Sequence, residues 1–248
     1  MRMLPAKPPF PFQLALVVFG LMELALLVRS SQAAQPTTDP AEVQALYAIF
    51  DRWGLDRPGG GGDPCPDVDV VAKLNSSIMF ESYDQAILCN CSYAQSTTCH
   101  VIGLKLQRKD VLGRIPEELA NLTYLQNLYL DRNYLTGPLP PFIGNLSAMR
   151  RLSLSGNALS GTVPRELGNL NELILLGLGT NNFSGPLPPE LGSSSSLQHL
   201  YVDSNGFSGK LPSTFAQLSN MTTFWAFDNN LSGKIPHFMG SWTKLTTL

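Results

Sequence analysis

The chain has 248 residues, of which 44% are hydrophobic and 15% are charged, and its formal net charge is −2. This nearly neutral balance excludes the strongly basic surface that nucleic-acid binding requires, so we expect no nucleic-acid partner. The chain contains 21 glycines and 19 prolines, a composition that indicates many turns.

Residues 1–34 have the features of a secretory signal peptide. Two basic residues precede an apolar stretch at positions 14–28, and Ala33 ends a group of small residues that suits a cleavage site. The alternative is a membrane anchor, which is disfavoured because the stretch is short and contains Glu23. We therefore expect the product to enter the secretory pathway and to act outside the cell or on the outer face of the plasma membrane.

Residues 35–100 are predicted to form an N-terminal cap. Within 40–55, apolar residues at helical spacing predict a short amphipathic helix, with polar residues such as Glu42 between them. The apolar set is Val43, Leu46, Ile49, Phe50 and Trp53. A glycine run follows at 59–62, but no Gly-Lys-Ser/Thr motif accompanies it, so it does not indicate a phosphate-binding loop. No cofactor motif is found elsewhere, and we expect no cofactor.

All four cysteines fall within this predicted cap. They are Cys65, Cys89, Cys91 and Cys99. An even number of cysteines in a secreted chain indicates two disulfides. A Cys89–Cys91 bond would close a very small ring, so two pairings remain, of which we favour Cys65–Cys89 with Cys91–Cys99. A zinc site that includes His100 is the alternative, but the spacing matches no common structural zinc pattern.

After position 100, a glycine followed three residues later by a proline recurs six times at a constant interval of 24 residues. The glycines are Gly113, Gly137, Gly161, Gly185, Gly209 and Gly233. Each is preceded by an apolar pattern such as Leu125-x-x-Leu128-x-Leu130, which indicates one short strand. A single strand cannot bury its apolar face alone, so neighbouring coils must stack into one parallel sheet. We expect repeated turns at the glycine and proline positions.

Two further columns recur with the same period. Asparagine occupies 133, 157, 181, 205 and 229, where we expect a buried side chain that bonds the backbone of adjacent coils. Lys109 takes this place in the first repeat, which we interpret as the edge of the ladder. The second column is apolar and consists of Leu135, Leu159, Phe183, Phe207 and Leu231. The fold class predicted for 101–248 is an α/β solenoid: an arc of six repeats and the start of a seventh, after a disulfide-stabilised helical cap.

These repeats resemble a known family. The segments Asn157-Ala-Leu-Ser-Gly-Thr-Val-Pro164 and Asn181-Asn-Phe-Ser-Gly-Pro-Leu-Pro188 are similar to the plant-specific class of leucine-rich repeat. The cap segments 40–53 and 89–101, and also 237–248, resemble one subfamily of plant receptor-like kinases. In that subfamily a leucine-rich ectodomain precedes a malectin-like domain, a membrane helix and a Ser/Thr kinase.

The resemblance implies an extracellular protein-interaction module that serves cell-surface signalling. Its partner would be a protein, a peptide, a cell-wall glycan or a co-receptor ectodomain, and any membrane contact would come through C-terminal parts beyond this chain. Because the sequence stops in the first strand of a seventh coil, we expect it to be a fragment of a longer protein or a truncated gene product. The alternative is a free secreted leucine-rich repeat protein, such as an inhibitor of pathogen wall-degrading enzymes.

The outward strand positions on the concave face form the candidate binding site. One column reads Lys105, Tyr129, Ser153, Gly177, Tyr201, Trp225, and the next reads Gln107, Asp131, Ser155, Gly179, Asp203, Phe227. Small residues in the middle coils let a partner approach, and aromatic residues often anchor interfaces. The candidate partner-binding residues are Tyr129, Asp131, Ser153, Ser155, Gly177, Gly179, Tyr201, Asp203, Trp225 and Phe227. The alternative is that they are ordinary solvent-facing residues, or that they contact another domain.

Catalysis finds little support in the sequence. No His-Arg-Asp or Asp-Phe-Gly kinase motif occurs, so we expect this chain not to be an enzyme, although the resemblance implies a kinase in the parent protein. We interpret His100, His199 and His237 as surface or edge residues, and we expect no metal site.

Glycosylation is expected at the Asn-x-Ser/Thr sequons Asn75, Asn121, Asn145, Asn182, Asn220 and Asn230, with Asn90 as the exception between two cysteines.

Overall fold

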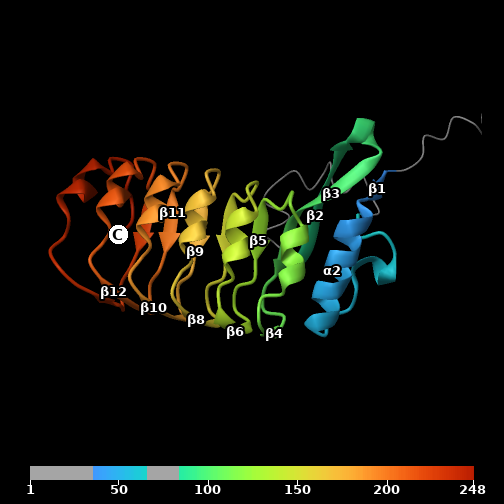
Figure 1. Cartoon of the computed structure of the whole chain (residues 1–248), viewed down its shortest axis with the longest axis horizontal. Helices are drawn as coiled ribbons and strands as arrows, with labels where there is room; N and C mark the ends of the chain where they lie inside the picture. The colour runs from blue at the N-terminus through green and yellow to red at the C-terminus, as the bar shows by residue number, and fades with distance from the viewer. Residues whose placement is uncertain (1–35, 66–83) are drawn as a thin grey trace, which may run out of the picture. The chain divides into compact units, whose positions relative to one another are not determined.

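The computed structural model describes residues 36–65 and 84–248 (Figure 1). The predicted signal peptide at 1–34 and the sequon Asn75 lie outside these residues. No helix in the described part of the chain is both long and apolar enough to cross a lipid bilayer.

One strand per coil builds the larger sheet, as the sequence predicts. The strands are β3 (Thr98–Leu106), β5 (Asn127–Tyr129), β7 (Arg151–Ser153), β9 (Leu175–Gly177), β11 (His199–Tyr201) and β13 (Thr223–Trp225). They pair in parallel and in sequence order. Residues 24 positions apart lie opposite one another, as Leu152 and Leu176 do. In Figure 1 the coils follow one another from green to red.

A second parallel sheet was not expected from the sequence. It consists of β4 (Leu112–Gly113), β6 (Tyr134–Pro138), β8 (Ala158–Gly161), β10 (Asn182–Gly185), β12 (Gly206–Gly209) and β14 (Asn230–Leu231). The repeated glycine lies within each of these strands except β14, where Gly233 follows two residues after the end of the strand. Gly161 has a φ of +80°, a conformation that costs other residues energy. Strands of two to five residues are too short to show a detectable alternation, which is why only turns were predicted.

The third side of each coil is a five-residue 3₁₀ helix. These helices are Glu117–Asn121, Pro141–Asn145, Arg165–Asn169, Pro189–Ser193, Ser213–Gln217 and His237–Ser241. Each begins directly after the repeated proline, whose fixed φ suits the residue that precedes a helix. The only α-helix of the described residues is α2, which lies in the cap.

A glycine inside three of these 3₁₀ helices controls how closely the next coil packs. At Gly168 a Cβ atom would lie 2.4 Å from the carbonyl oxygen of Glu190, so only glycine fits. The same holds at Gly144 and Gly192. Ala120 and Ala216 take this place in two other coils, and there the successive 3₁₀ helices pack less closely.

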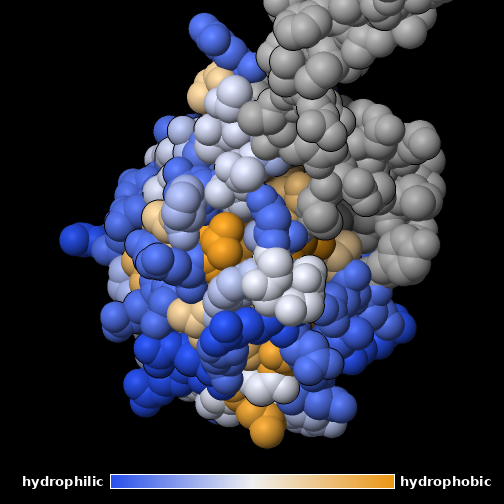
Figure 2. Space-filling model, turned by 90° about the vertical axis from the view of Figure 1, so that its right-hand side faces the viewer, coloured by the Kyte–Doolittle hydropathy of each residue, from blue (hydrophilic) through white to orange (hydrophobic). Residues whose placement is uncertain are grey.

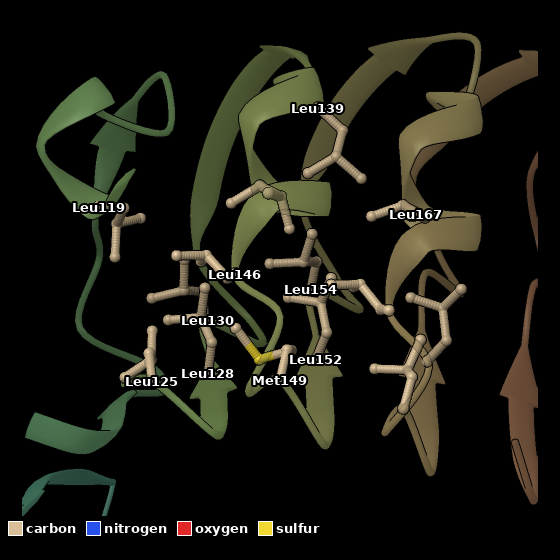
Figure 3. Packing of buried hydrophobic residues seen from close by; sticks show 14 of the residues in the cluster. Leu119, Leu125, Leu128, Leu130, Leu139, Leu146, Met149, Leu152, Leu154 and Leu167 are labelled. Atoms are coloured by element: carbon tan, nitrogen blue, oxygen red, sulfur yellow. The ribbon is translucent and has the colours of Figure 1, made fainter. Parts of the chain in front are cut away.

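The core is a stack of aliphatic side chains, one layer per coil (Figure 3). Leu128, Leu152 and Leu176 point inward from successive strands and are fully buried. The predicted apolar column is also buried, and the rings of Phe183 and Phe207 lie 6.1 Å apart in a stacked arrangement. Ser194 interrupts this pattern. It is fully buried at a position where the neighbouring coils have leucine, and its hydroxyl has no hydrogen-bond partner among the described residues.

The predicted asparagine ladder is present in the structure. The side-chain oxygen of Asn181 accepts from the backbone N–H of Leu159 at 3.1 Å, and its amide nitrogen donates to the carbonyl oxygen of Leu154 at 3.0 Å. Both partners belong to the preceding coil, and the same pattern repeats along the array. At the edge, Lys109 lacks the amide, but its backbone N–H donates to Asn133 at 2.9 Å.

The cap combines β1 (Thr37–Thr38), α2 (Pro40–Arg52) and β2 (Gln85–Tyr93), which pairs with β3 in an antiparallel manner. Helix α2 begins after Asp39, whose side chain accepts from the N–H of Ala41 at 2.8 Å. It ends at Arg52, earlier than the predicted 40–55. The view onto the cap end shows mostly hydrophilic residues on the part of the surface that is not grey (Figure 2), as a terminal repeat requires.

Two disulfides tie the cap together. Cys65 is bonded to Cys89, and Cys91 is bonded to Cys99, which is the pairing that the sequence favoured. Because all four cysteines are in disulfides, the alternative zinc site is wrong. Strand β3 runs from the cap into the first coil, so the boundary predicted at residue 100 falls inside one continuous strand.

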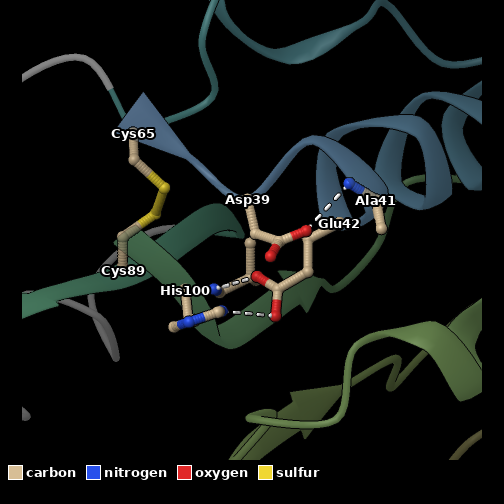
Figure 4. A network of polar contacts seen from close by, with 7 residues as sticks. Asp39, Ala41, Glu42, Cys65, Cys89 and His100 are labelled. Atoms are coloured by element: carbon tan, nitrogen blue, oxygen red, sulfur yellow. Dashed lines mark hydrogen bonds and ion pairs between the residues drawn. A yellow bond between two sulfur atoms is a disulfide. The ribbon is translucent and has the colours of Figure 1, made fainter. Parts of the chain in front are cut away.

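Glu42 and His100 form a buried pair between α2 and β3 (Figure 4). The Nδ1 atom of His100 lies 3.0 Å from Oε1 of Glu42, and the N–H of Val101 donates to Oε2 at 2.7 Å. The ring of His100 also stacks on Tyr124. The interpretation of His100 as a surface or edge residue is therefore wrong. Burial raises the pKa of Glu42, although the hydrogen bonds from Val101 and His100 act in the opposite direction.

Candidate functional site

The two outward columns predicted from the sequence are brought into register by the larger sheet. Tyr129 lies beside Ser153, Ser153 beside Gly177, and Gly177 beside Tyr201. Trp225 then follows Tyr201 in the last full strand. We call this side of the solenoid the strand face. Because neighbouring strands are about 4.8 Å apart, a ligand that lies across the strand face contacts one coil after another.

A groove of about 590 Å³ lies on the strand face, where the strands end. Its walls are Gln107, Arg108, Asp131, Arg132, Ser155, Gly156, Gly179, Thr180, Tyr201, Asp203 and Trp225. Six of the ten predicted partner-binding residues are among them. The groove is open and runs across six coils, so its form suits an extended ligand better than a compact one.

Four predicted residues do not line this groove. Tyr129 lies under the ammonium group of Lys105, which is 5.8 Å from the centre of the ring. Ser153 is buried, and Gly177 has no room for a side chain because a Cβ atom there would meet the hydroxyl of Ser153 at 2.7 Å. Phe227 stands beside the groove and is 60% exposed. The small residues are therefore partly covered by their neighbours and do not form an open floor.

A third column of residues also lines the groove and was not predicted from the sequence. It consists of the residues that directly precede the recurring asparagine position of each coil. Arg108, Arg132 and Thr180 adopt φ values of +52° to +56° there, and Gly156 has a φ of +71°. This left-handed conformation ends the strand and turns the next residue, asparagine, into the core. The fixed offset of one residue from each asparagine was the signal that could have found the column.

Asp131 is held by a closed set of hydrogen bonds. The side chain of Gln107 donates to its Oδ2 atom at 2.7 Å, and the hydroxyl of Ser153 donates to Oδ1. These partners come from the coils on either side of Asp131. Asp131 is 9% exposed, and both of its carboxylate oxygens accept a hydrogen bond within the protein.

Asp203 has the same position in its coil and the same 9% exposure, but its surroundings differ. The outward residues beside it are Gly179 and Phe227, neither of which has a side-chain donor. Only the backbone N–H of Asp203 itself serves its carboxylate. Burial raises the pKa of Asp203, and the negative charge of Asp228 adds to that rise.

Aromatic side chains gather at the C-terminal part of the strand face. The rings of Tyr201 and Trp225 meet edge to face with centres 5.1 Å apart, and Trp225 lies 6.0 Å from Phe227. His199 is half-buried at the start of β11, the strand that contains Tyr201. Burial lowers the pKa of His199. Trp225 and Phe227 are exposed and Tyr201 is half-buried. Such a cluster of accessible rings supplies apolar area at low entropic cost, as interface anchors do.

The described residues offer no metal centre, because no three of their His, Cys, Asp or Glu side chains are grouped to hold an ion. His199 contacts the hydroxyl of Thr223 and not a carboxylate. His237 is exposed in the last 3₁₀ helix, as expected.

The predicted glycosylation sites that the structure describes lie away from the strand face. Asn121 and Asn145 are exposed at the ends of 3₁₀ helices, and Asn182 and Asn230 are exposed at the starts of β10 and β14. Asn220 is partly buried, with its amide bonded to Ser195 and Lys244. Asn90 is half-buried and accepts from the N–H of Ser92.

Comparison with known proteins agrees with this geometry. The family model described as Leucine Rich Repeat matches residues 124–146, 148–170 and 196–218. The fold is a leucine-rich repeat solenoid. Two probable leucine-rich repeat receptor-like serine/threonine-protein kinases of Arabidopsis thaliana are 44% and 43% identical to this chain over 102 residues. The match spans 40% of this chain but only 10% of the length of these relatives.

Solved structures of plant receptors resemble the solenoid as well. The plant peptide hormone receptor RGFR1, solved in complex with RGF2, is 33% identical with a TM-score of 0.56, over 59% of this chain and 23% of that one. The receptor kinase HAESA of Arabidopsis, solved with the peptide hormone IDA and the co-receptor SERK1, is 30% identical with a TM-score of 0.54, over 61% and 25%. A chain of the BIR3–SERK2 complex from Arabidopsis thaliana is 26% identical with a TM-score of 0.59, over 78% and 95%.

Proposed function

We propose that this solenoid is the ligand-binding part of an extracellular receptor and that it binds an extended peptide along the strand face. The observation that carries the proposal is the groove across six coils, which ends at the rings of Tyr201 and Trp225. An extended chain can contact successive coils there, while aromatic anchors supply most of the binding energy. RGFR1 and HAESA, two of the similar proteins, were each solved with a peptide bound.

The positions of the predicted glycosylation sites also support the strand face as the side that binds a ligand. If Asn121, Asn145, Asn182 and Asn230 carry glycans, their exposed positions place the sugars on the 3₁₀ helices and the second sheet. The strand face stays free for a ligand or for a co-receptor ectodomain. Mass spectrometry of the secreted protein after enzymatic deglycosylation checks which of these asparagines are occupied.

The test starts from a random-peptide library displayed on phage and selected on the chain produced by a secretory host. Peptides that bind are synthesised, and their affinity is measured by calorimetry for the original chain and for the triple variant Tyr201→Ala, Trp225→Ala, Phe227→Ala. Because each lost anchor costs about 1–2 kcal/mol, we expect the triple variant to bind at least roughly a hundredfold more weakly.

The matched control is Tyr134→Ala, which removes an exposed aromatic ring from β6 in the second sheet. We expect it to bind as the original chain does. Equal binding by the triple variant, or loss of binding in the control, would contradict a site on the strand face. Thermal unfolding of each variant shows whether a loss of binding reflects a loss of folding.

We also propose that the parent protein belongs to the receptor-like kinase subfamily that carries a malectin-like domain after the repeats and that it acts at the plasma membrane. The cap segment from Cys89 to His100 supports this, because its Cys-x-Cys…Cys-His arrangement is more specific than the repeats. Sequencing the full-length transcript tests it. We expect a malectin-like domain and a kinase, and a cysteine-bearing cap followed by a stop codon would contradict the assignment.

A further inference from the structure

We propose that Asp203, together with Tyr201 and Trp225, forms a site for a guanidinium group, so that the bound peptide presents an arginine side chain there. The inference rests on the proposed function, because it names a chemical requirement of the ligand at the same groove. The three residues all line that groove. Nothing in the repeat pattern requires an acidic residue at this position, since four of the six coils have another residue there.

The comparison with Asp131 shows that Asp203 lacks what a buried carboxylate normally has. Both residues are 9% exposed at equivalent positions. Asp131 accepts from Gln107 and Ser153, whereas no side chain donates to Asp203. A buried carboxylate without a donor costs free energy, so it is retained where it serves another purpose or where a partner from outside completes it.

The carboxylate of Asp203 is directed into the groove. A Cβ atom on Gly179 would lie 2.6 Å from its Oδ1 atom, so the carboxylate lies over the bare backbone of Gly179. That backbone and Asp203 both line the groove. A ligand group that enters the groove at this coil therefore meets the unpaired oxygen atoms directly.

The local charge favours a cation. The positive charges that line the groove, Arg108 and Arg132, belong to the first two coils, whereas Asp203 belongs to the fifth. At about 4.8 Å per strand, Arg132 is roughly 14 Å away from Asp203, which is more than a Debye length at physiological salt. The nearer charge is the carboxylate of Asp228, which is also negative. A bound cation relieves both the desolvation and the repulsion.

The aromatic rings select a guanidinium over an ammonium ion. The planes of the Tyr201 and Trp225 rings make an angle of 78°, so the edge of one ring meets the face of the other. A planar guanidinium can stack on an aromatic face while its N–H groups reach the two carboxylate oxygens in the same plane. An ammonium ion has no flat face, and it binds such a pair only as a point charge.

The experiment uses the random-peptide selection described above, with two kinds of altered peptide and two protein variants added. Selected peptides are resynthesised with each arginine replaced by citrulline, its neutral isostere, or by lysine. They are titrated against the original chain, Asp203→Asn, and the exposed control Glu172→Gln, which removes an acidic charge away from the strand face. Binding is followed by the change in tryptophan fluorescence, which we expect to come from Trp225 because Trp53 and Trp242 are buried away from the groove.

We expect the selected peptides to share an arginine. Citrulline in its place and Asp203→Asn should each weaken binding by roughly tenfold or more, as expected for loss of a charge-assisted bidentate pair. Lysine should restore only part of the affinity, and Glu172→Gln should change nothing. Equal affinity for arginine and lysine would overturn the guanidinium assignment.

Failure of this inference is distinguishable from failure of the proposed function. Peptides without a shared arginine that bind Asp203→Asn normally, yet lose binding to the triple aromatic variant, would overturn the arginine site and leave the peptide groove standing. Peptides that bind the triple variant unchanged, or a library without any binder, would overturn both. Thermal unfolding without any peptide gives an independent readout. Asp203→Asn should not lower the melting temperature, whereas Asp131→Asn should.

Discussion

Asn181 and Leu159 are 22 residues apart in sequence, yet the side-chain oxygen of Asn181 accepts the backbone N–H of Leu159 at 3.1 Å. This hydrogen bond joins two consecutive coils and occurs where the chain leaves the larger sheet. The same amide donates to Leu154, also in the preceding coil, and to Leu178 in its own coil. One side chain therefore satisfies several backbone groups that no regular secondary structure serves.

Replacing this asparagine should weaken the solenoid. We expect Asn181→Ala to lower the free energy of unfolding by about 2–4 kcal/mol, because it leaves several buried backbone groups without a partner. The neighbouring Asn182→Ala is the matched control, since Asn182 is exposed on β10 and should change stability by less than about 0.5 kcal/mol. Urea unfolding followed by circular dichroism measures both, and equal effects would contradict the ladder.

The glycines inside the 3₁₀ helices give a second prediction. In Gly168→Ala the new Cβ atom would lie 2.4 Å from the Glu190 carbonyl oxygen, so we expect a loss of about 2–4 kcal/mol as the coils are forced apart. Gly240→Ala changes the same position of the last coil, where no atom lies within 4 Å, and it should be neutral or slightly stabilising. Differential scanning calorimetry compares the two, and similar melting temperatures would show that glycine does not set the spacing.

Ser194 gives a prediction of the opposite sign. Its fully buried hydroxyl has no partner among the described residues, so Ser194→Ala should raise the free energy of unfolding by about 1 kcal/mol. Ser195→Ala, at the exposed neighbouring position, should have no such effect. A drop in stability on Ser194→Ala, measured in urea, would mean that the hydroxyl has a partner after all.

The pH dependence of cap stability follows from Asp63. Burial alone would raise the pKa of Asp63, but hydrogen bonds from the hydroxyl and N–H of Thr38 and from the N–H of Cys65 outweigh it, and the pKa is lowered. A lowered pKa means that ionised Asp63 stabilises the fold above the ordinary carboxyl pKa of about 4 and that this contribution is lost as the pH falls through the lowered pKa.

We therefore expect Asp63→Asn to be less stable than the original chain near pH 7. The difference in unfolding free energy should shrink steadily below about pH 4. Chemical unfolding at a series of pH values measures this difference directly. If the difference stayed constant, or grew as the pH was lowered, the hydrogen bonds from Thr38 and Cys65 would not control this carboxyl group.

The sequence predicts the repeated parts of the fold better than the unique ones. The 24-residue period defines the strands, the core columns and the asparagine ladder, because the same physical requirement recurs in every coil. Glu42 shows where this reasoning fails. The sequence pattern showed it only as a polar residue of an amphipathic helix. Its burial depends on a hydrogen bond from the N–H of Val101, 59 residues away, which no local pattern encodes.

The candidate site was predicted in outline. Counting from the strand pattern identified Asp131, Tyr201, Asp203 and Trp225 because alternate residues of a strand point to one side. It could not show that the hydroxyl of Ser153 donates a hydrogen bond to Asp131 and is therefore not available to a ligand. Nor could it show that Arg132 lines the groove because its backbone has a left-handed conformation. Contacts between side chains of successive coils decide which outward residues stay available, and these appear only in three dimensions.

The central claim is that a peptide binds along the strand face, and the most direct measurement is the site at which a photo-reactive version of a selected peptide becomes attached. After irradiation and digestion, mass spectrometry identifies the labelled residues. We expect labels on the groove walls and on the aromatic residues at 201–227, spread over several coils. Labels confined to the 3₁₀ helices or to the second sheet would contradict the account, whatever the affinity of the peptide.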